Sequence, residues 1–182
     1  MFYCFLADGF EEIEAVATID ILRRAGIEVK TVSVQGSCAV GAHKIQITAD
    51  MNIESFKVDS SITGVILPGG MPGVSNLYKF EIIKDAVNYC IDRNLPVCAI
   101  CAAPSILGKM GVLTDKNATC YPGFETELLN ANVSDDCVVI DGNFITAKGS
   151  GCANEFAFAI VEKVLSKSAA DDVAAAMQIQ FG

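Results

Sequence analysis

The sequence has few of the features expected of a nucleic-acid, membrane or zinc-binding protein. Its 182 residues hold 13 Lys and Arg against 22 Asp and Glu, for a formal net charge of −9, and the basic residues are scattered. Nucleic acids and anionic membranes select basic patches, so neither is an expected partner. No apolar run approaches the length of a transmembrane helix. Zinc is disfavoured because there is a single histidine, His43, and no second CxxC motif.

An export signal is not predicted either. Residues 2–7 are apolar, but no basic leader precedes them and Asp8, Glu11 and Glu12 follow directly. We therefore expect a cytoplasmic protein whose cysteines are reduced thiols. Most of them lie in apolar stretches of sequence, namely Cys4, Cys90, Cys98, Cys120 and Cys137.

Strand-like and helix-like segments alternate along the chain. Strands are predicted over residues 2–7, 28–34, 64–67 and 96–100, and helices over 11–25, 81–93, 105–110, 153–165 and 168–178, the last capped by Ser168. A hairpin or edge strand is expected over 40–48, and a hairpin over 137–147 about Asp141-Gly142. With 52% hydrophobic residues, the strands can be buried on both faces. This alternation predicts an α/β protein with a parallel sheet between helices, as one domain over 1–182.

The most informative segment is Ala99-Ile100-Cys101-Ala102-Ala103-Pro104. It follows an apolar strand and precedes a helix, whose first turn tolerates Pro104. Cys101 is therefore expected on a sharp strand-to-helix corner, the thiol version of a nucleophile elbow. Cys98 and Cys101 form a CxxC, but strand alternation sends Cys98 into the core, which disfavours a catalytic dithiol.

Three loops follow the predicted parallel strands: residues 8–14, 68–73 and 101–104. Such loops converge on the carboxyl edge of a parallel sheet. They would bring together a nucleophile, Cys101, and an acid/base, Glu14. Glycine lets the backbone approach a reacting group closely, so the amides of Gly70 and Ala102 are candidate oxyanion donors. Gly69 is a further candidate lining residue.

Three motifs in this order resemble the ThiJ/PfpI superfamily, and most closely its DJ-1-like branch. They are Asp8-Gly9-Phe10-Glu11-Glu12-Ile13-Glu14, Leu67-Pro68-Gly69-Gly70 and the Cys101 segment. The similarity runs from residue 1 to about residue 165. It implies a flavodoxin-like three-layer α/β sandwich with a mostly parallel sheet, of the class I glutamine-amidotransferase type, and usually a homodimer. It also implies an oxidation-prone Cys101 paired with the Glu14 carboxyl.

Family membership implies several alternative activities. One is cofactor-free conversion of methylglyoxal to lactate or removal of early glycation adducts. Another, of a different class, is non-enzymatic oxidative-stress sensing or chaperone action through oxidation of Cys101. A third, cysteine peptidase or amidase activity, is disfavoured. Many relatives have a histidine before a proline near the cysteine, whereas this sequence has Tyr121 before Pro122.

His43 stands where the family often has an arginine near the dimer interface. It and Tyr121 are candidate lining residues, and Arg24 would aid His43 as a contact from a second subunit. Glu14 and Cys101 are expected to titrate as one coupled pair. Our expectation is a protonated Glu14 beside a Cys101 thiolate, with a thiol pKa below the ordinary value of about 8.5.

Overall fold

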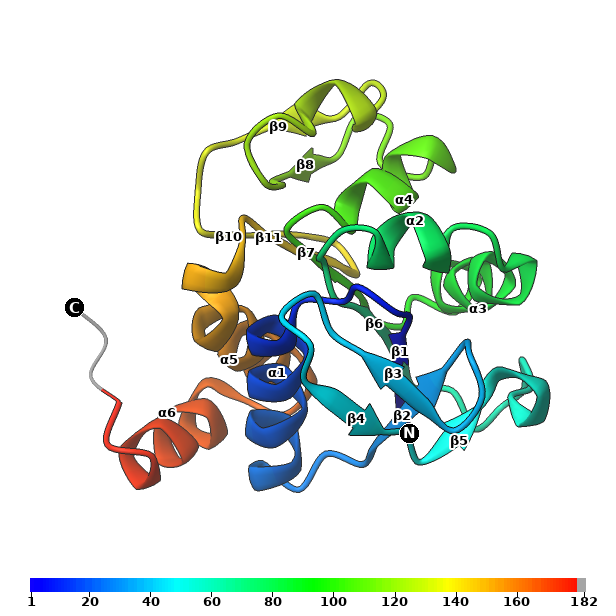
Figure 1. The fold of residues 1–182 in the computed structure, drawn as a ribbon. Coiled ribbons are helices and arrows are strands. Elements are labelled where there is room, and N and C mark those ends of the chain that lie inside the picture. Colours follow the sequence, from blue (N-terminus) through cyan, green and yellow to red (C-terminus); the bar gives the residue numbers. More distant parts are fainter. Residues whose placement is uncertain (180–182) are drawn as a thin grey trace.

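A twisted sheet separates two layers of helices (Figure 1). The computed structural model describes residues 1–179. The sheet order is β10 (Val138–Asp141), β11 (Phe144–Ala147), β7 (Val97–Ile100), β6 (Gly64–Leu67), β1 (Phe2–Leu6), β2 (Val29–Ser33) and β5 (Met51–Asn52). All neighbours pair in parallel except β10 and β11, which form an antiparallel hairpin. The predicted parallel α/β architecture is therefore confirmed, and β5 is an edge strand that the sequence did not reveal.

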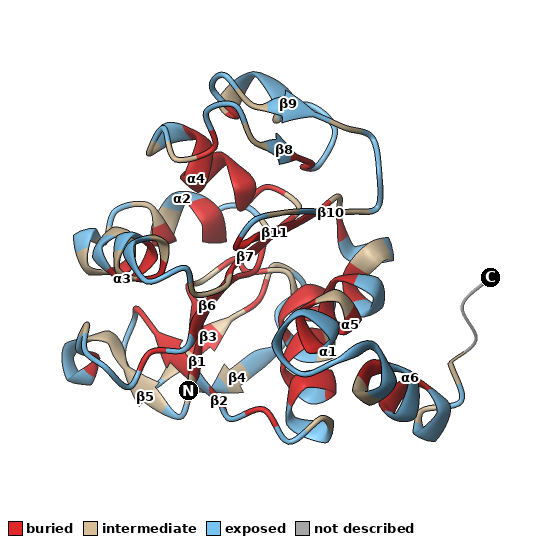
Figure 2. Ribbon diagram, turned by 180° about the vertical axis from the view of Figure 1, so that it is seen from behind, coloured by how far each residue is buried: buried red, intermediate tan, exposed pale blue. Residues whose placement is uncertain are grey.

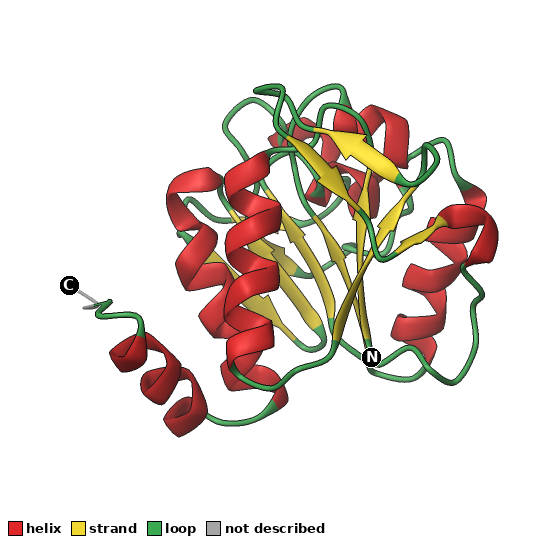
Figure 3. Ribbon diagram, turned by 60° about the horizontal axis from the view of Figure 1, so that its bottom comes forward, coloured by secondary structure: helices red, strands yellow, loops and turns green. Residues whose placement is uncertain are grey.

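Helices cover both faces of the sheet (Figures 1 and 3). One layer contains α1 (Glu12–Arg24) and α5 (Ala153–Val164), with α6 (Lys167–Ala176) packed beside α5. The other contains α2 (Gly73–Leu77), α3 (Glu81–Asp92) and α4 (Pro104–Lys109). The short α2 was not predicted. The layers enclose two hydrophobic cores, one on each side of the sheet (Figure 2).

Alternation along strand β7 explains why the sheet needs helices on both sides. Val97 and Ala99 lie in one core, and Cys98 and Ile100 lie in the other. All four side chains are fully buried, because successive residues of a strand point to opposite faces. The predicted core position of Cys98 is confirmed.

Smaller elements lie outside the main sheet. They are the pair β3 (Cys38–Val40) and β4 (Gln46–Thr48), the pair β8 (Asn117–Ala118) and β9 (Asn132–Val133), and the single turns η1 (Ile53–Ser55), η2 (Glu125–Glu127) and η3 (Ser150–Cys152). The β3–β4 pair is antiparallel, which confirms the hairpin alternative. Helix α6 begins one residue before the expected start. Ser166, not Ser168, caps it by accepting a hydrogen bond from the Ala169 N–H at 3.2 Å.

The sequence predicted that all cysteines are reduced thiols, and the structure shows that this prediction is wrong for two of them. Cys137 and Cys152 form a disulfide with their Cα atoms 5.7 Å apart. The β10–β11 hairpin returns the chain to Cys137, whose carbonyl accepts the Lys148 N–H at 3.0 Å. Cys137 is also exposed rather than set in apolar surroundings. The other six cysteines are free thiols.

Within residues 1–179, no helix combines the length and the apolar character needed to cross a membrane.

Candidate active site

The loops after β1, β6 and β7 meet at the carboxyl edge of the sheet. Strand β1 pairs with β2 on one side and with β6 on the other, so the chain winds away in both directions from the β1–β6 pair. Open α/β sheets place their ligands at this kind of switch point. The Glu11 N–H bonds to the Gly69 carbonyl at 2.9 Å, which joins the first two loops directly.

Cys101 occupies a left-handed backbone conformation between β7 and α4. Its φ is +65°, a region that residues other than glycine rarely adopt. Its N–H continues the sheet by bonding to the Ala147 carbonyl at 2.8 Å, and Pro104 begins α4 three residues later. The sharp corner holds the half-buried thiol at the sheet edge, which is the elbow geometry expected from the sequence.

Glu14 lies in the first turn of α1 and points into the protein. It is 1% exposed, and its Oε2 accepts the Gly69 N–H at 2.8 Å. Its Oε1 is buried without a well-formed hydrogen bond. Only glycine fits at position 69, because a Cβ atom there would lie 2.6 Å from both the Cys101 Cβ and the Glu14 Oε2. The missing side chain of Gly69 therefore lets the carboxyl and the thiol come together.

Burial raises the pKa of Glu14 to about 7, against the opposing effect of hydrogen bonds from the Cys101 thiol and the Gly69 amide. Burial also raises the pKa of the Cys101 thiol to about 12, and the neighbouring Glu14 carboxylate adds to this effect. The direction for the thiol is opposite to the one expected from the sequence. Cys101 and Glu14 therefore hold one proton between them above neutral pH, with the thiol facing the carboxylate.

Two backbone amides favour the thiolate. The N–H groups of Gly70 and Ala102 hydrogen-bond to the Cys101 sulfur and lower its pKa. Gly70 has a φ of +88°, and a Cβ atom there would lie 2.4 Å from the Glu11 nitrogen. The structure thus brings together Cys101, Glu14, Gly69, Gly70 and Ala102, the five residues placed at the sheet edge by the sequence.

A pocket of about 490 Å³ opens over Cys101. Glu11, Glu14, His43, Gly70, Ala102 and Tyr121 line it, together with Ile13, Met71, Phe124 and Ser150. Glu11 and these last four residues were not predicted to line it. Phe124 comes from a loop that carries no recognisable motif.

Tyr121 reaches the pocket wall through a backbone contact. Its N–H donates to the Cys101 carbonyl at 2.8 Å, and its side chain is 49% exposed. Its ring also adjoins the turn at Gly149, where an added Cβ atom would lie 3.3 Å away. The tyrosine therefore joins the Cys101 corner to the turn that precedes α5.

Within its own chain Arg24 lies far from the Cys101 pocket, and its expected role as a contact from a second subunit stays a prediction. Arg24 ends α1, ten residues after Glu14, which corresponds to about 15 Å along a helix. Its Nε pairs instead with the Asp20 carboxylate at 2.7 Å, one turn earlier.

His43 lines the pocket but interacts with Glu12, not with Cys101. Its Nδ1 lies 3.0 Å from the Glu12 Oε2, and this hydrogen bond raises the pKa of the imidazole. Burial alone would raise the pKa of Glu12, but hydrogen bonds from the side chain and backbone of His43 lower it overall.

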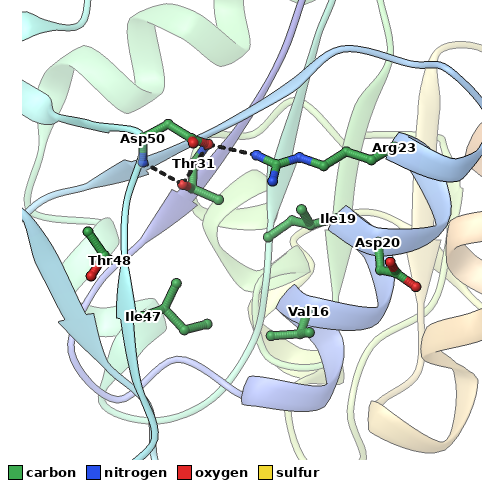
Figure 4. A pocket seen from close by; sticks show the side chains of 8 residues that line it. All are labelled: Val16, Ile19, Asp20, Arg23, Thr31, Ile47, Thr48 and Asp50. Atoms are coloured by element: carbon green, nitrogen blue, oxygen red, sulfur yellow. Dashed lines mark hydrogen bonds and ion pairs between the residues drawn. The ribbon is translucent and has the colours of Figure 1, made fainter.

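A second hollow of about 370 Å³ lies along the other half of α1 (Figure 4). Arg23 and Thr31 both point toward Asp50 there (Figure 4). The Arg23 guanidinium lies 2.7 Å from the Asp50 carboxylate, which also accepts the Thr31 N–H at 2.8 Å. Among residues 1–179 no thiol lines this hollow, and Arg23, Thr31 and Asp50 satisfy one another there.

Comparison with known proteins fits this geometry. A profile of the DJ-1/PfpI family matches residues 2–163. The chain belongs to the DJ-1/PfpI family. It is 36% identical over 179 residues to Protein dj-1beta of Drosophila melanogaster, which covers 97% of this chain and 95% of the fly protein. It is 33% identical over 174 residues to the Parkinson disease protein 7 homolog of Danio rerio, covering 93% and 92% of the two chains.

Solved structures of DJ-1 proteins have the same fold. The crystal structure of Drosophila melanogaster DJ-1beta matches with a TM-score of 0.93 at 33% identity, over 99% of this chain and 98% of the fly chain. A family relative from Pyrococcus abyssi, 30% identical over 80% of this chain and 87% of its own, carries the name deglycase. The predicted flavodoxin-like sandwich and the DJ-1-like branch are therefore confirmed.

Proposed function

We propose that this protein converts or removes small reactive carbonyls by a cysteine-dependent reaction that needs no cofactor, as a glyoxalase or deglycase. The observation that carries the proposal is the position of Cys101. It lies on a left-handed corner inside a pocket, beside a buried carboxyl whose pKa is about 7. A pKa near neutrality suits a group that must both accept and return a proton. The deglycase name of the Pyrococcus relative supports the same reaction class.

The reaction begins with attack of the Cys101 sulfur on the aldehyde carbon of a 2-oxoaldehyde. Glu14 takes the thiol proton as the carbon–sulfur bond forms, which makes an otherwise weak nucleophile reactive. The carbonyl oxygen gains negative charge in this step. The Gly70 and Ala102 amides, which face the sulfur, would stabilise that charge and the resulting hemithioacetal.

Glu14 then returns this proton to the alkoxide oxygen, which completes the hemithioacetal and leaves the carboxylate free to move the next proton. Transfer of the aldehyde hydrogen from the first carbon to the second turns the hemithioacetal of methylglyoxal into a thioester of lactate on Cys101. Water then cleaves the thioester, releases lactate and restores the thiol. The substrate undergoes no net oxidation, because one carbon is oxidised while its neighbour is reduced. This internal balance explains why neither an oxidant nor a cofactor is required.

Peptidase or amidase activity is less well supported. A cysteine hydrolase of that type uses an imidazole as the base beside the sulfur. Tyr121 occupies the expected histidine position, and the Nδ1 of His43 is engaged by Glu12. The group next to the thiol that can act as a base is therefore the Glu14 carboxylate and not an imidazole.

Redox sensing is the second candidate function. If peroxide oxidises Cys101 to a sulfinate, a protonated Glu14 could donate a hydrogen bond to the new oxygen. The buried Glu14 Oε1, which makes no well-formed hydrogen bond now, favours this possibility. A sensor would react once per chain, whereas an enzyme would consume many equivalents of aldehyde.

We also propose that the protein is a homodimer that uses the exposed side of α1. Ile13, Val16 and Ile45 are exposed by 58%, 47% and 57% and border one apolar hollow of about 580 Å³. Water contact with so large a cluster is unfavourable, so a second copy is a suitable cover. Light scattering should give twice the chain mass, and Val16→Glu should shift it toward the monomer. A monomeric wild type would contradict the proposal.

The deciding experiment measures methylglyoxal consumption and lactate formation without added glutathione. We expect many turnovers per chain, and at least about a 1,000-fold loss in Cys101→Ser, because a hydroxyl is a far weaker nucleophile than a thiol. Cys38→Ser removes a partly exposed thiol elsewhere and is the matched control. A single stoichiometric oxidation by peroxide with no lactate would instead support the sensor. Unchanged lactate formation in Cys101→Ser would refute the cysteine-dependent reaction.

A further inference from the structure

Three potential metal ligands meet at the mouth of the Cys101 pocket. Glu11 and Glu12 lie where α1 begins, and His43 lies in the loop between β3 and β4. One ligand atom from each residue lies within 4.8 Å of the other two. The His43 Nδ1 is 3.0 Å from the Glu12 Oε2 and 3.7 Å from the Glu11 Oε2.

The backbone holds the central ligand in place. The Glu12 Oε1 accepts the His43 N–H at 2.7 Å and the Ile45 N–H at 3.4 Å, which leaves its Oε2 toward the imidazole. Glu12 is only 5% exposed, and an added Cβ atom at Gly41 would collide with its carboxyl group. Outer hydrogen bonds of this kind fix the orientation of metal-ligating carboxylates.

The spacing of the ligand atoms suits a small divalent ion. Zinc lies about 2.0–2.2 Å from imidazole nitrogen and carboxylate oxygen, so ligand atoms in a tetrahedral site are roughly 3.4 Å apart. The two distances from the His43 Nδ1 lie on either side of this value. One imidazole with two carboxylates favours zinc-class ions over magnesium, which prefers an all-oxygen octahedral shell.

We propose that Glu11, Glu12 and His43 form a binding site for a zinc-class divalent cation at the mouth of the Cys101 pocket. The ion takes the place of the proton shared by the His43 Nδ1 and the Glu12 Oε2, and that proton is released to solvent. The His43 side chain is 70% exposed, which gives the ion a path from solvent.

Occupancy of this site would affect the pocket directly. Glu11 and His43 line the same hollow as Cys101, so an open coordination position of the ion faces the region that receives substrate. A water molecule or a substrate oxygen could occupy that position. The site is independent of the chemistry proposed for Cys101, and its test does not need enzyme activity.

The test is a titration of the full chain with Co²⁺ alone, followed by visible absorption under reducing conditions. Cobalt bound by nitrogen and oxygen gives weak bands, whereas thiolate ligation adds strong sulfur-to-metal charge transfer. We expect one saturable site per chain without the sulfur signal, and competition by Zn²⁺ but not by Mg²⁺.

Variants identify the ligands. His43→Gln and Glu11→Gln should weaken Co²⁺ binding by more than about 100-fold, since each removes a direct ligand. Glu162→Gln removes the same charge from an exposed position on α5 and should change the affinity less than twofold. Circular dichroism checks that each variant is folded. Lack of saturable binding, a sulfur signature, or unchanged affinity in His43→Gln would each overturn the site and leave an imidazole–carboxylate cluster without an ion.

Discussion

Two hollows lie along helix α1, and they differ in whether the carboxylate inside has a cationic partner. In the hollow near the end of the helix, Asp50 is satisfied by Arg23 and Thr31, and these contacts lower its pKa against the effect of burial (Figure 4). In the hollow near its start, Glu14 has no cationic partner among residues 1–179, and burial raises its pKa to about 7. A paired charge stabilises the fold, whereas a buried and unpaired one lowers stability and becomes available for proton transfer.

The strongest test of this contrast is the catalytic rate of the Glu14→Gln variant. The amide keeps the shape of the side chain but cannot accept a proton, so we expect kcat for methylglyoxal to fall by between about 100-fold and 10,000-fold. The wild-type rate should rise with pH through about 7, as Glu14 ionises, and the variant should lack this inflection. A pH–rate profile of both proteins checks the prediction. An inflection retained in the variant would show that another group is the base.

The same substitution should lower the catalytic rate but raise the relative stability of the protein at high pH. The pKa of Glu14 is raised from 4.5 to about 7 in the folded state, so folding favours the protonated acid. That contribution is complete below pH 4.5 and is lost as the pH rises through 7. Between pH 5 and pH 8 the wild type should lose roughly 2–3 kcal/mol relative to Glu14→Gln. Urea unfolding at both pH values measures this difference, and a constant gap would argue against a raised pKa.

The smallest effect is expected in the other hollow. Asp50→Asn removes an ion pair that is about half exposed and weakens the hydrogen bonds to Thr31. We expect a loss of about 1 kcal/mol in the free energy of unfolding near neutral pH, and no change in turnover. Thermal unfolding and the lactate assay measure the two properties. A marked loss of turnover would show that the two hollows are coupled through α1.

The sequence revealed the parts of the site that depend on local order along the chain. A strand, a proline and a helix in succession were enough to place Cys101 on its corner. The alternation of strands and helices brought Glu14 and Gly70 to the same sheet edge. The location of Cys98 in the core followed from the alternation of side chains along the strand that precedes Cys101.

Features that depend on three-dimensional contacts were missed or predicted wrongly. The Cys137–Cys152 disulfide forms because a hairpin folds back, whereas the prediction of reduced thiols rested on cellular setting alone. The expected contact of Arg24 with the site of a second subunit stays a prediction, because it depends on how two copies pack. The direction of the thiol pKa was wrong because burial raises it, with a contribution from the neighbouring Glu14 carboxylate, and burial depends on how segments distant in sequence pack together.

The left-handed backbone at Cys101 has a consequence for protein engineering. A side chain at a φ of +65° carries a steric cost that glycine avoids, and such costs are of order 1–3 kcal/mol. Selection of a variant library for heat resistance alone would therefore favour glycine at position 101. Selection for growth in the presence of methylglyoxal would instead recover cysteine. The preferred residue at this one position thus reports which of the two properties was under selection.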